Sequence, residues 1–266
     1  MLKVERKQGR AAKLSFIFVA IIVLLVIFSL SVKLILLLKK SQFDGQHRFT
    51  IEIIGKKNQV ISFCPKLNSI SIVNITSLDG GKASSLLEVP INAYIRVSSP
   101  SFNKNNISSL FFKMLFRSRL KADNVNKIDI LKIALFSSSV AAGHIKIVSV
   151  SGNDDYKTIQ SAISGLFVYP SIQEEGDTIQ VVNGTGVSGL AARLSEFISN
   201  MGGDVILVTN SANNVTSSKI VYSGKNDYTV AELSKILGFS KNKVEGDGIA
   251  NVTLTIGGNS LTNLTF

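Results

Sequence analysis

The chain has 266 residues and a formal net charge of +11, with 29 lysines and arginines against 18 acidic residues. Its single cysteine, Cys64, excludes an intramolecular disulfide. With His47 and His144 as the only histidines, the cysteine and histidine clusters of a structural zinc site are excluded as well. We therefore expect neither a metal site nor a cofactor.

The N-terminal region predicts a membrane anchor. Leu14 to Val32 is a run of 19 residues without a charge, and a helix over 14–38 would cross the hydrocarbon core of a bilayer. The run exceeds the apolar core of a cleaved signal peptide and no Ala-x-Ala site follows it, which favours an uncleaved signal-anchor. Residues 1–13 carry five basic residues and one acidic residue, so the tail is expected to stay cytoplasmic.

This topology places the bulk of the chain outside the cytoplasmic membrane. Residues 41–172 carry 15 basic and 8 acidic residues, whereas residues 173–266 carry 6 and 9. The basic part would face lipid headgroups and anionic wall polymers. Nucleic acid is not expected as a partner, because the basic region lies on the wrong side of the membrane.

An α/β middle domain is predicted over 41–166. Alternating apolar residues indicate strands at 49–55, 59–64, 69–75, 91–97 and 144–150, with helices at 107–120 and 128–142. Basic residues alternate with phenylalanines around the first helix, which suits a membrane surface or a lipid phosphate. The binding candidates are Arg96, Arg117 and Arg119, beside Lys113, Lys121, Phe111, Phe112 and Phe116. The alternative is a core helix with buried phenylalanines and a solvated basic face.

A linker is predicted at 167–177 because the segment contains Pro170, Gly176 and three acids. The C-terminal domain, 178–266, follows. Its predicted strands are 178–183, 204–210, 218–223 and 250–257, and its helices are 188–201 and 228–238. The order βαββαβ predicts a ferredoxin-like sandwich, with two helices on one face of an antiparallel sheet. The whole chain is therefore assigned to the α+β class, with an N-terminal transmembrane helix.

A glycine-rich turn joins the first strand and helix of this domain, and its candidate binding residues are Asn183, Gly184, Gly186 and Gly189. The three glycines match G-x-G-x-x-G, the turn that holds a dinucleotide phosphate. Such a site also needs an acid at the end of the next strand, whereas Asp204 begins that strand. A turn that needs glycine to pack a helix on a sheet is the other interpretation.

The string VVNGTGVSGLAARL, with VILVTNS, KIVYSG, VAELSKILG and NVTLTIGGN after it, resembles the C-terminal domain of LytR-CpsA-Psr cell-envelope proteins of bacteria. QVISFCPKLNSISIVNI and VPINAYIRVSSPSF are similar to segments of that family's core domain. Full members transfer a glycopolymer from a polyprenyl-pyrophosphate carrier to peptidoglycan. The first of these segments is predicted to be a hairpin, in which a turn at 66–68 joins the strands 59–64 and 69–75. The family's pyrophosphate-binding arginine is missing after this hairpin, and its aspartate is Asn92. The core-like domain is accordingly interpreted as truncated and degenerate.

These features together predict a single-pass membrane protein that acts in cell-envelope assembly or regulation by binding rather than catalysis. Its expected partners are the cytoplasmic membrane and peptidoglycan or an anionic wall polymer. Two alternatives stay open: a divergent glycopolymer phosphotransferase, and a nucleotide-binding domain at the GTGVSG turn.

Overall fold

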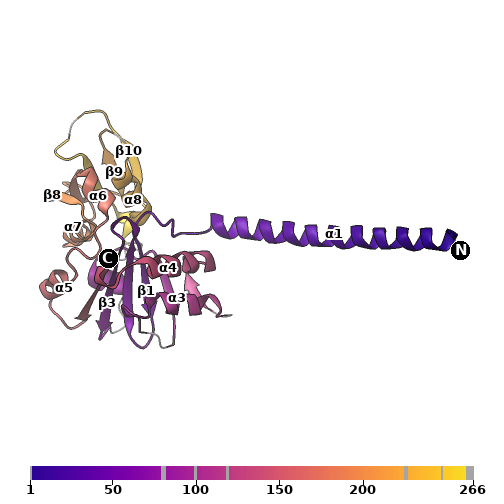
Figure 1. Ribbon diagram of the computed structural model, residues 1–266. Coiled ribbons are helices and arrows are strands. Elements are labelled where there is room, and N and C mark those ends of the chain that lie inside the picture. The colour runs from indigo at the N-terminus through magenta and orange to yellow at the C-terminus, as the bar shows by residue number, and fades with distance from the viewer. Residues whose placement is uncertain are drawn as a thin grey trace. The chain divides into compact units, whose positions relative to one another are not determined.

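The computed structural model describes residues 2–78, 82–98, 101–117, 120–224, 227–246 and 248–261, with the backbone alone for residues 2–15 and 34. It divides into two compact units, Met1–Gln42 and Phe43–Phe266. The second unit contains two separate β-sheets, which Figure 1 shows with their helices. Helices and mixed sheets in one chain confirm the predicted α+β class.

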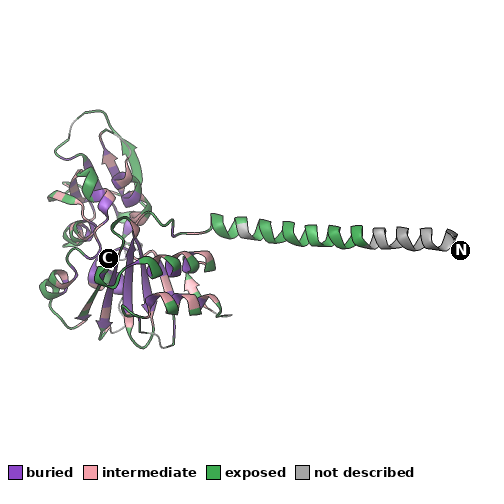
Figure 2. Ribbon diagram, in the orientation of Figure 1, coloured by how far each residue is buried: buried purple, intermediate pink, exposed green. Residues whose placement is uncertain are grey.

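The first unit consists of one helix, α1 (Leu2–Lys39). Its segment Phe16–Lys39 has 24 residues and a mean hydropathy of 3.0, and 0% of its most apolar stretch is buried. The segment is therefore long and apolar enough to cross a bilayer. In Figure 2 its described residues are coloured as exposed along the helix. A helical segment whose exposed residues are nearly all apolar, with Lys33 as the one charge between Phe16 and Lys39, is unstable in water, which supports the predicted anchor.

A six-stranded mixed sheet forms the first half of the second unit, in the order β5-β4-β1-β2-β3-β6. The predicted hairpin between the second and third strands is present, with Asn58–Cys64 antiparallel to Ser69–Thr76. The strands are β1 (Phe49–Ile54), β2 (Asn58–Cys64), β3 (Ser69–Thr76), β4 (Ala93–Arg96), β5 (Lys121–Asp123) and β6 (Ile145–Ser151).

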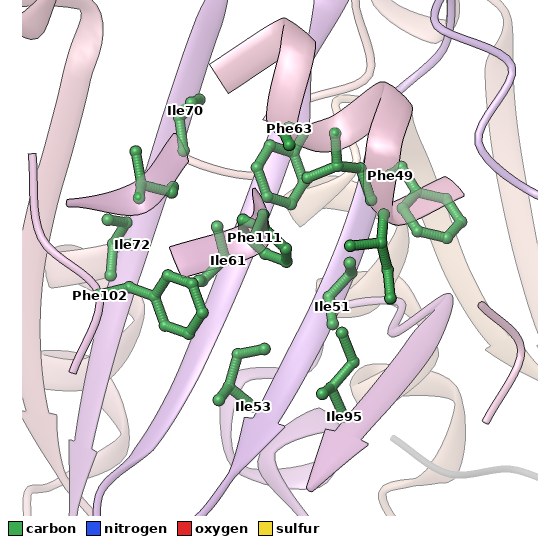
Figure 3. Packing of buried hydrophobic residues seen from close by; sticks show 14 of the residues in the cluster. Phe49, Ile51, Ile53, Ile61, Phe63, Ile70, Ile72, Ile95, Phe102 and Phe111 are labelled. Atoms are coloured by element: carbon green, nitrogen blue, oxygen red, sulfur yellow. The ribbon is translucent and has the colours of Figure 1, made fainter. Parts of the chain in front are cut away.

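Each face of this sheet buries its own hydrophobic cluster, because successive side chains of a strand point to opposite faces. On β3, Ile70 and Ile72 pack with α3 (Ile107–Leu115) and α4 (Lys127–Ser139). Val73 and Ile75 pack with α2 (Ala83–Leu87) and α5 (Tyr156–Ile163) on the other face. Figure 3 shows the first cluster, in which the Phe63 and Phe111 rings meet edge to face at 5.6 Å.

The second sheet is five-stranded, in the order β10-β9-β11-β7-β8. Its elements are β7 (Thr178–Asn183), α7 (Leu190–Asn200), β8 (Asp204–Asn210), β9 (Lys219–Tyr222), α8 (Tyr228–Leu237), β10 (Ser240–Lys243) and β11 (Val252–Ile256). The predicted βαββαβ elements are present, but the ferredoxin-like arrangement is wrong. The central strand β11 runs parallel to β7, and β7 runs parallel to β8. The strand–helix–strand unit therefore places its two strands side by side, which an antiparallel sandwich does not.

The predicted linker, 167–177, is a packed connection that contains α6 (Pro170–Glu175). Phe167, Tyr169 and Ile172 in this segment are buried. Arg48, itself buried, binds the start of the connection through Nε to the Val168 carbonyl at 2.7 Å and through a terminal nitrogen to the Leu166 carbonyl at 2.8 Å. Burial lowers the pKa of Arg48 from its usual value.

Candidate functional site

The glycine-rich turn after β7 is organised by the side chain of Asn183, which is buried. Its Oδ1 accepts hydrogen bonds from the Thr185 backbone N–H at 3.0 Å and from the Thr185 hydroxyl at 2.8 Å. Its Nδ2 donates to the Val187 carbonyl at 2.7 Å. An asparagine that bonds the backbone two residues on is a usual way to build a turn. Both the oxygen and the nitrogen of the Asn183 side chain are thus hydrogen-bonded within the turn.

The backbone conformation or the close packing around it explains why each of the three turn positions is a glycine. A Cβ on Gly184 would lie 2.7 Å from the Val215 Cβ and 2.8 Å from the Ile256 carbonyl oxygen, so no side chain fits. Gly186 and Gly189 have φ values of +74° and +78°, a region that other residues avoid. Gly189 directly precedes α7, and its left-handed conformation sets the direction in which that helix begins.

The acid that a dinucleotide site requires lies at the wrong end of its strand. In the parallel pairing of β7 and β8, Thr178 faces Asp204 and Asn183 faces Asn210. Asp204 is therefore separated from the glycine turn by the length of the strand, about 20 Å at 3.3 Å per residue. This geometry favours the packing interpretation of the turn over nucleotide binding.

A basic pocket of about 530 Å³ lies at one end of the first sheet. Its lining residues are Ile54, Arg96, Val97, Ser98, Arg117, Leu120 and Lys121. Arg96 and Lys121 face each other directly on the antiparallel strands β4 and β5, and Arg117 follows the end of α3. The described lining contains three cations and no carboxylate, and the nearest ionic partner of Arg96 is Asp123 at 4.0 Å.

Like charges directly opposite each other on neighbouring strands repel. A bound anion would therefore reduce the repulsion between Arg96 and Lys121. Arg96 and Arg117, two of the predicted binding residues, thus meet in one pocket with Lys121, whereas Arg119 lies outside the described residues. The interleaved aromatic residues separate: Phe111 is fully buried and Phe112 packs against the core. Phe116 is 87% exposed, next to Arg117.

A second polar site, which the sequence analysis missed, joins the two sheets. Glu88, whose side chain is 4% exposed, accepts a hydrogen bond from the Tyr156 hydroxyl at 2.7 Å and from Arg193 Nε at 3.0 Å. Asn200 donates to the Glu88 carbonyl at 3.1 Å. Arg193 and Asn200 lie on α7, and the other two residues come from the first half of the unit. Burial and the Glu88 carboxylate raise the pKa of Tyr156.

Three acids gather where α6 meets the start of α8. Carboxylate oxygens of Glu175, Asp177 and Asp227 lie within 4.8 Å of one another. Glu175 accepts from the backbone N–H groups of Tyr228 and Thr229 at 2.9 Å and 2.7 Å, and Asp227 is the N-cap of α8. Negative charge at a helix N-terminus is stabilising, so capping accounts for two of the acids.

The third acid, Asp177, is expected to make stability depend on pH. Burial, together with Asp227 and Glu175, raises its pKa to about 6. The folded chain then binds the proton of the Asp177 carboxyl more tightly than the unfolded chain does. The protonated carboxyl therefore contributes fully to stability below the pKa that Asp177 has in the unfolded chain, and this contribution is lost as pH rises through about 6. Asp177→Asn should melt above the wild type at neutral pH and lose this pH dependence. Melting curves across a pH series measure it, and parallel curves for the two proteins would contradict it.

Comparison with known protein families matches the C-terminal part of the chain. Residues 178–259 match the family model described as LytR cell envelope-related transcriptional attenuator. This confirms the resemblance predicted for the C-terminal domain. No curated protein sequence matches the chain significantly.

Solved structures show only distant likeness. A transcriptional regulator from Enterococcus faecalis is 11% identical, with a TM-score of 0.20 over 76% of this chain and 92% of that one. The Lin1025 protein from Listeria innocua is 11% identical, with a TM-score of 0.17 over 73% and 100%. TagT from B. subtilis is 10% identical, with a TM-score of 0.17 over 80% and 87%. TM-scores of this size support no inference about fold or function.

Proposed function

We propose, on the premise that residues 178–259 form a LytR-type C-terminal domain, that this chain is a membrane-anchored protein of the bacterial cell envelope. Its second unit, Phe43–Phe266, would lie outside the cytoplasmic membrane and act in envelope assembly or regulation by binding. The apolar helix Phe16–Lys39 supports the anchor. The five basic residues among the first 13 support a cytoplasmic N-terminus.

The basic pocket is the single observation that carries the binding assignment. Arg96, Arg117 and Lys121 concentrate three positive charges in a hollow at one end of the first sheet. The ligand class that this suits is a phosphate-bearing anion, supplied by an anionic wall polymer or by lipid headgroups. The exposed Phe116 beside the pocket suits insertion among lipids, as an aromatic residue next to cations does at membrane surfaces.

Binding is proposed rather than phosphotransfer because of what the described lining offers. Arginine and lysine hold a phosphate, but magnesium needs oxygen ligands, and the lining residues include no carboxylate. The segment similar to the core of the LytR-CpsA-Psr family also has Asn92 where that family has aspartate. Asn92 here accepts a hydrogen bond from the Thr50 backbone at 2.7 Å and so ties two strands together.

Replacement of the three pocket cations by uncharged glutamine tests this proposal. The full chain in detergent micelles is mixed with purified wall material or with anionic vesicles, sedimented, and compared with Arg96→Gln/Arg117→Gln/Lys121→Gln. A cation near an anionic surface contributes about 1 kcal/mol, so the triple variant should bind at least tenfold more weakly at low salt. Binding of the wild type should weaken as added salt shortens the screening length.

The matched control removes three exposed lysines outside the pocket lining, Lys104, Lys146 and Lys157. This variant has the same net charge as the pocket variant and should retain most of the binding. If the two variants lost the same amount of binding, net charge alone would explain the loss. That result would contradict a specific anion site at the pocket. The wall and vesicle arms separate the two sources of phosphate. A melting temperature raised by NAD would instead favour nucleotide binding.

A further inference from the structure

A second pocket, of about 580 Å³, lies where helices of the two halves of the second unit meet. Its lining comes from α2 and the residue that ends it, from α5 and the loop before it, and from α7. It shares no lining residue with the basic pocket. A pocket of this size where two parts of a protein meet is a usual place for a small ligand.

Glu88 presents a buried carboxylate to this pocket, and both of its oxygens accept hydrogen bonds from other lining residues. Oε2 accepts from the Tyr156 hydroxyl, and Oε1 accepts from Arg193 Nε. Glu88 is also the C-cap of α2, with a φ of +50°, where glycine is the usual residue. Backbone strain at a residue that lines a pocket is typical of ligand-binding positions.

The described lining carries an excess of negative charge. Its carboxylates are Glu88, Asp154 and Glu196, and its one cation is Arg193. Arg193 is already paired with Glu88. Asp154 and Glu196 lie at exposed positions, and neither forms an ion pair with another residue that the structure describes. A hollow with this charge attracts a positively charged group.

The remaining lining suits an apolar stem attached to that group. Ile159 is buried, Leu86 is half-buried, and Ala192 leaves space because its side chain is small. Tyr156, whose hydroxyl is held by Glu88, remains 48% exposed. A tyrosine ring attracts a cation that lies over its face, so this residue suits both the stem and the charge.

We propose that this pocket binds a primary ammonium group on an aliphatic stem, such as a lysine-type side chain in a peptide. The ammonium would lie near the carboxylates of Asp154 and Glu196, with its stem against Leu86 and Ile159. The ligand is opposite in charge to the anion proposed for the basic pocket. Failure of either proposal therefore leaves the other intact.

Two probes of equal length test the charge of the ligand. The full chain in micelles of a non-ionic detergent is titrated by calorimetry with Nα-acetyl-lysine methylamide and with Nα-acetyl-norleucine methylamide, which lacks the ammonium. The norleucine probe should bind at least tenfold more weakly, because it has no charge for the two carboxylates to attract. Pentylamine then separates the sources: weaker binding than the lysine probe assigns the ligand to a peptide, and equal or tighter binding to a free amine.

Removal of the two unpaired charges tests the place of binding. Asp154→Asn/Glu196→Gln should bind the lysine probe at least tenfold more weakly, with a melting temperature near that of the wild type. Asparagine keeps a side-chain oxygen for the Ser151 N–H, which donates to Asp154 at 2.7 Å. The matched control, Asp204→Asn/Glu245→Gln, removes two exposed acids outside the lining and should bind like the wild type.

Three results would overturn the proposal. The wild type binds neither the lysine probe nor pentylamine, it binds the lysine and norleucine probes equally, or the pocket variant and its control lose the same affinity. If the pocket variant does not fold, the comparison of the probes on the wild type still decides.

Discussion

Replacing Arg193 with methionine is expected to lower the free energy of unfolding by about 3 kcal/mol. The change leaves Glu88 buried at 4% side-chain exposure without its cationic partner, and a buried uncompensated carboxylate is costly. The expected value lies at the lower end for broken buried pairs, because Arg193 is 45% exposed and the Tyr156 hydroxyl still donates to Glu88. Denaturant unfolding of the full chain measures the loss.

A double-mutant cycle with Glu88→Gln separates the pair from its surroundings. If the ion pair carries the effect, Arg193→Met in the Glu88→Gln background should cost much less than in the wild type. Additive losses would show that Arg193 contributes through packing alone. Because Arg193 lies on α7 and Glu88 follows α2, a large coupling would show that this contact between the LytR-type domain and the first half of the unit stabilises the fold.

Gly184→Ala is expected to destabilise the chain by about 2–3 kcal/mol. Two fixed neighbours, the Val215 Cβ and the Ile256 carbonyl, would lie within 2.8 Å of the new Cβ, and neither is the end of a flexible side chain. The Gly184 N–H also donates to that carbonyl at 2.9 Å, so relief of the clash stretches a hydrogen bond between the turn and β11. Thermal and denaturant unfolding report the change.

Gly143→Ala is the matched control, because nothing lies within 4 Å of its Cβ position. This substitution should leave stability within about 0.5 kcal/mol of the wild type. Equal stability of the two variants would mean that the space at Gly184 is not filled as described. The GTGVSG string would then need a reason outside packing, and the nucleotide interpretation would regain support.

The sequence predicted most elements because their hydrophobic periods are clear. Strands 178–183 and 204–210 were predicted with the bounds that the structure has. β10 (Ser240–Lys243) was missed because it is fully exposed and lacks an apolar face. Helices α2 and α5 were missed because five or eight residues give too short a period to distinguish from a loop.

Strand order and the polar contacts between sheets depend on tertiary packing, which a local pattern does not contain. The position of β11 beside β7 rests on pairs such as Leu254 with Val181, far apart in sequence. Glu88 and Arg193 are 105 residues apart, and the string VVNGTGVSGLAARL, which contains Arg193, does not indicate its partner. Arg96 and Arg117 were identified by composition, but their meeting in one pocket required β5, a strand of three residues that was not predicted.

Cysteine accessibility tests the central claim, an extracytoplasmic second unit, most directly. Ala212 is exposed in the loop after β8, and Gln8 lies in the basic tail. Ala212→Cys should react with a membrane-impermeant thiol reagent in intact spheroplasts, whereas Gln8→Cys should react only after lysis. Labelling of Ala212→Cys only after lysis would contradict the account, whether Gln8→Cys is labelled in intact spheroplasts or only after lysis.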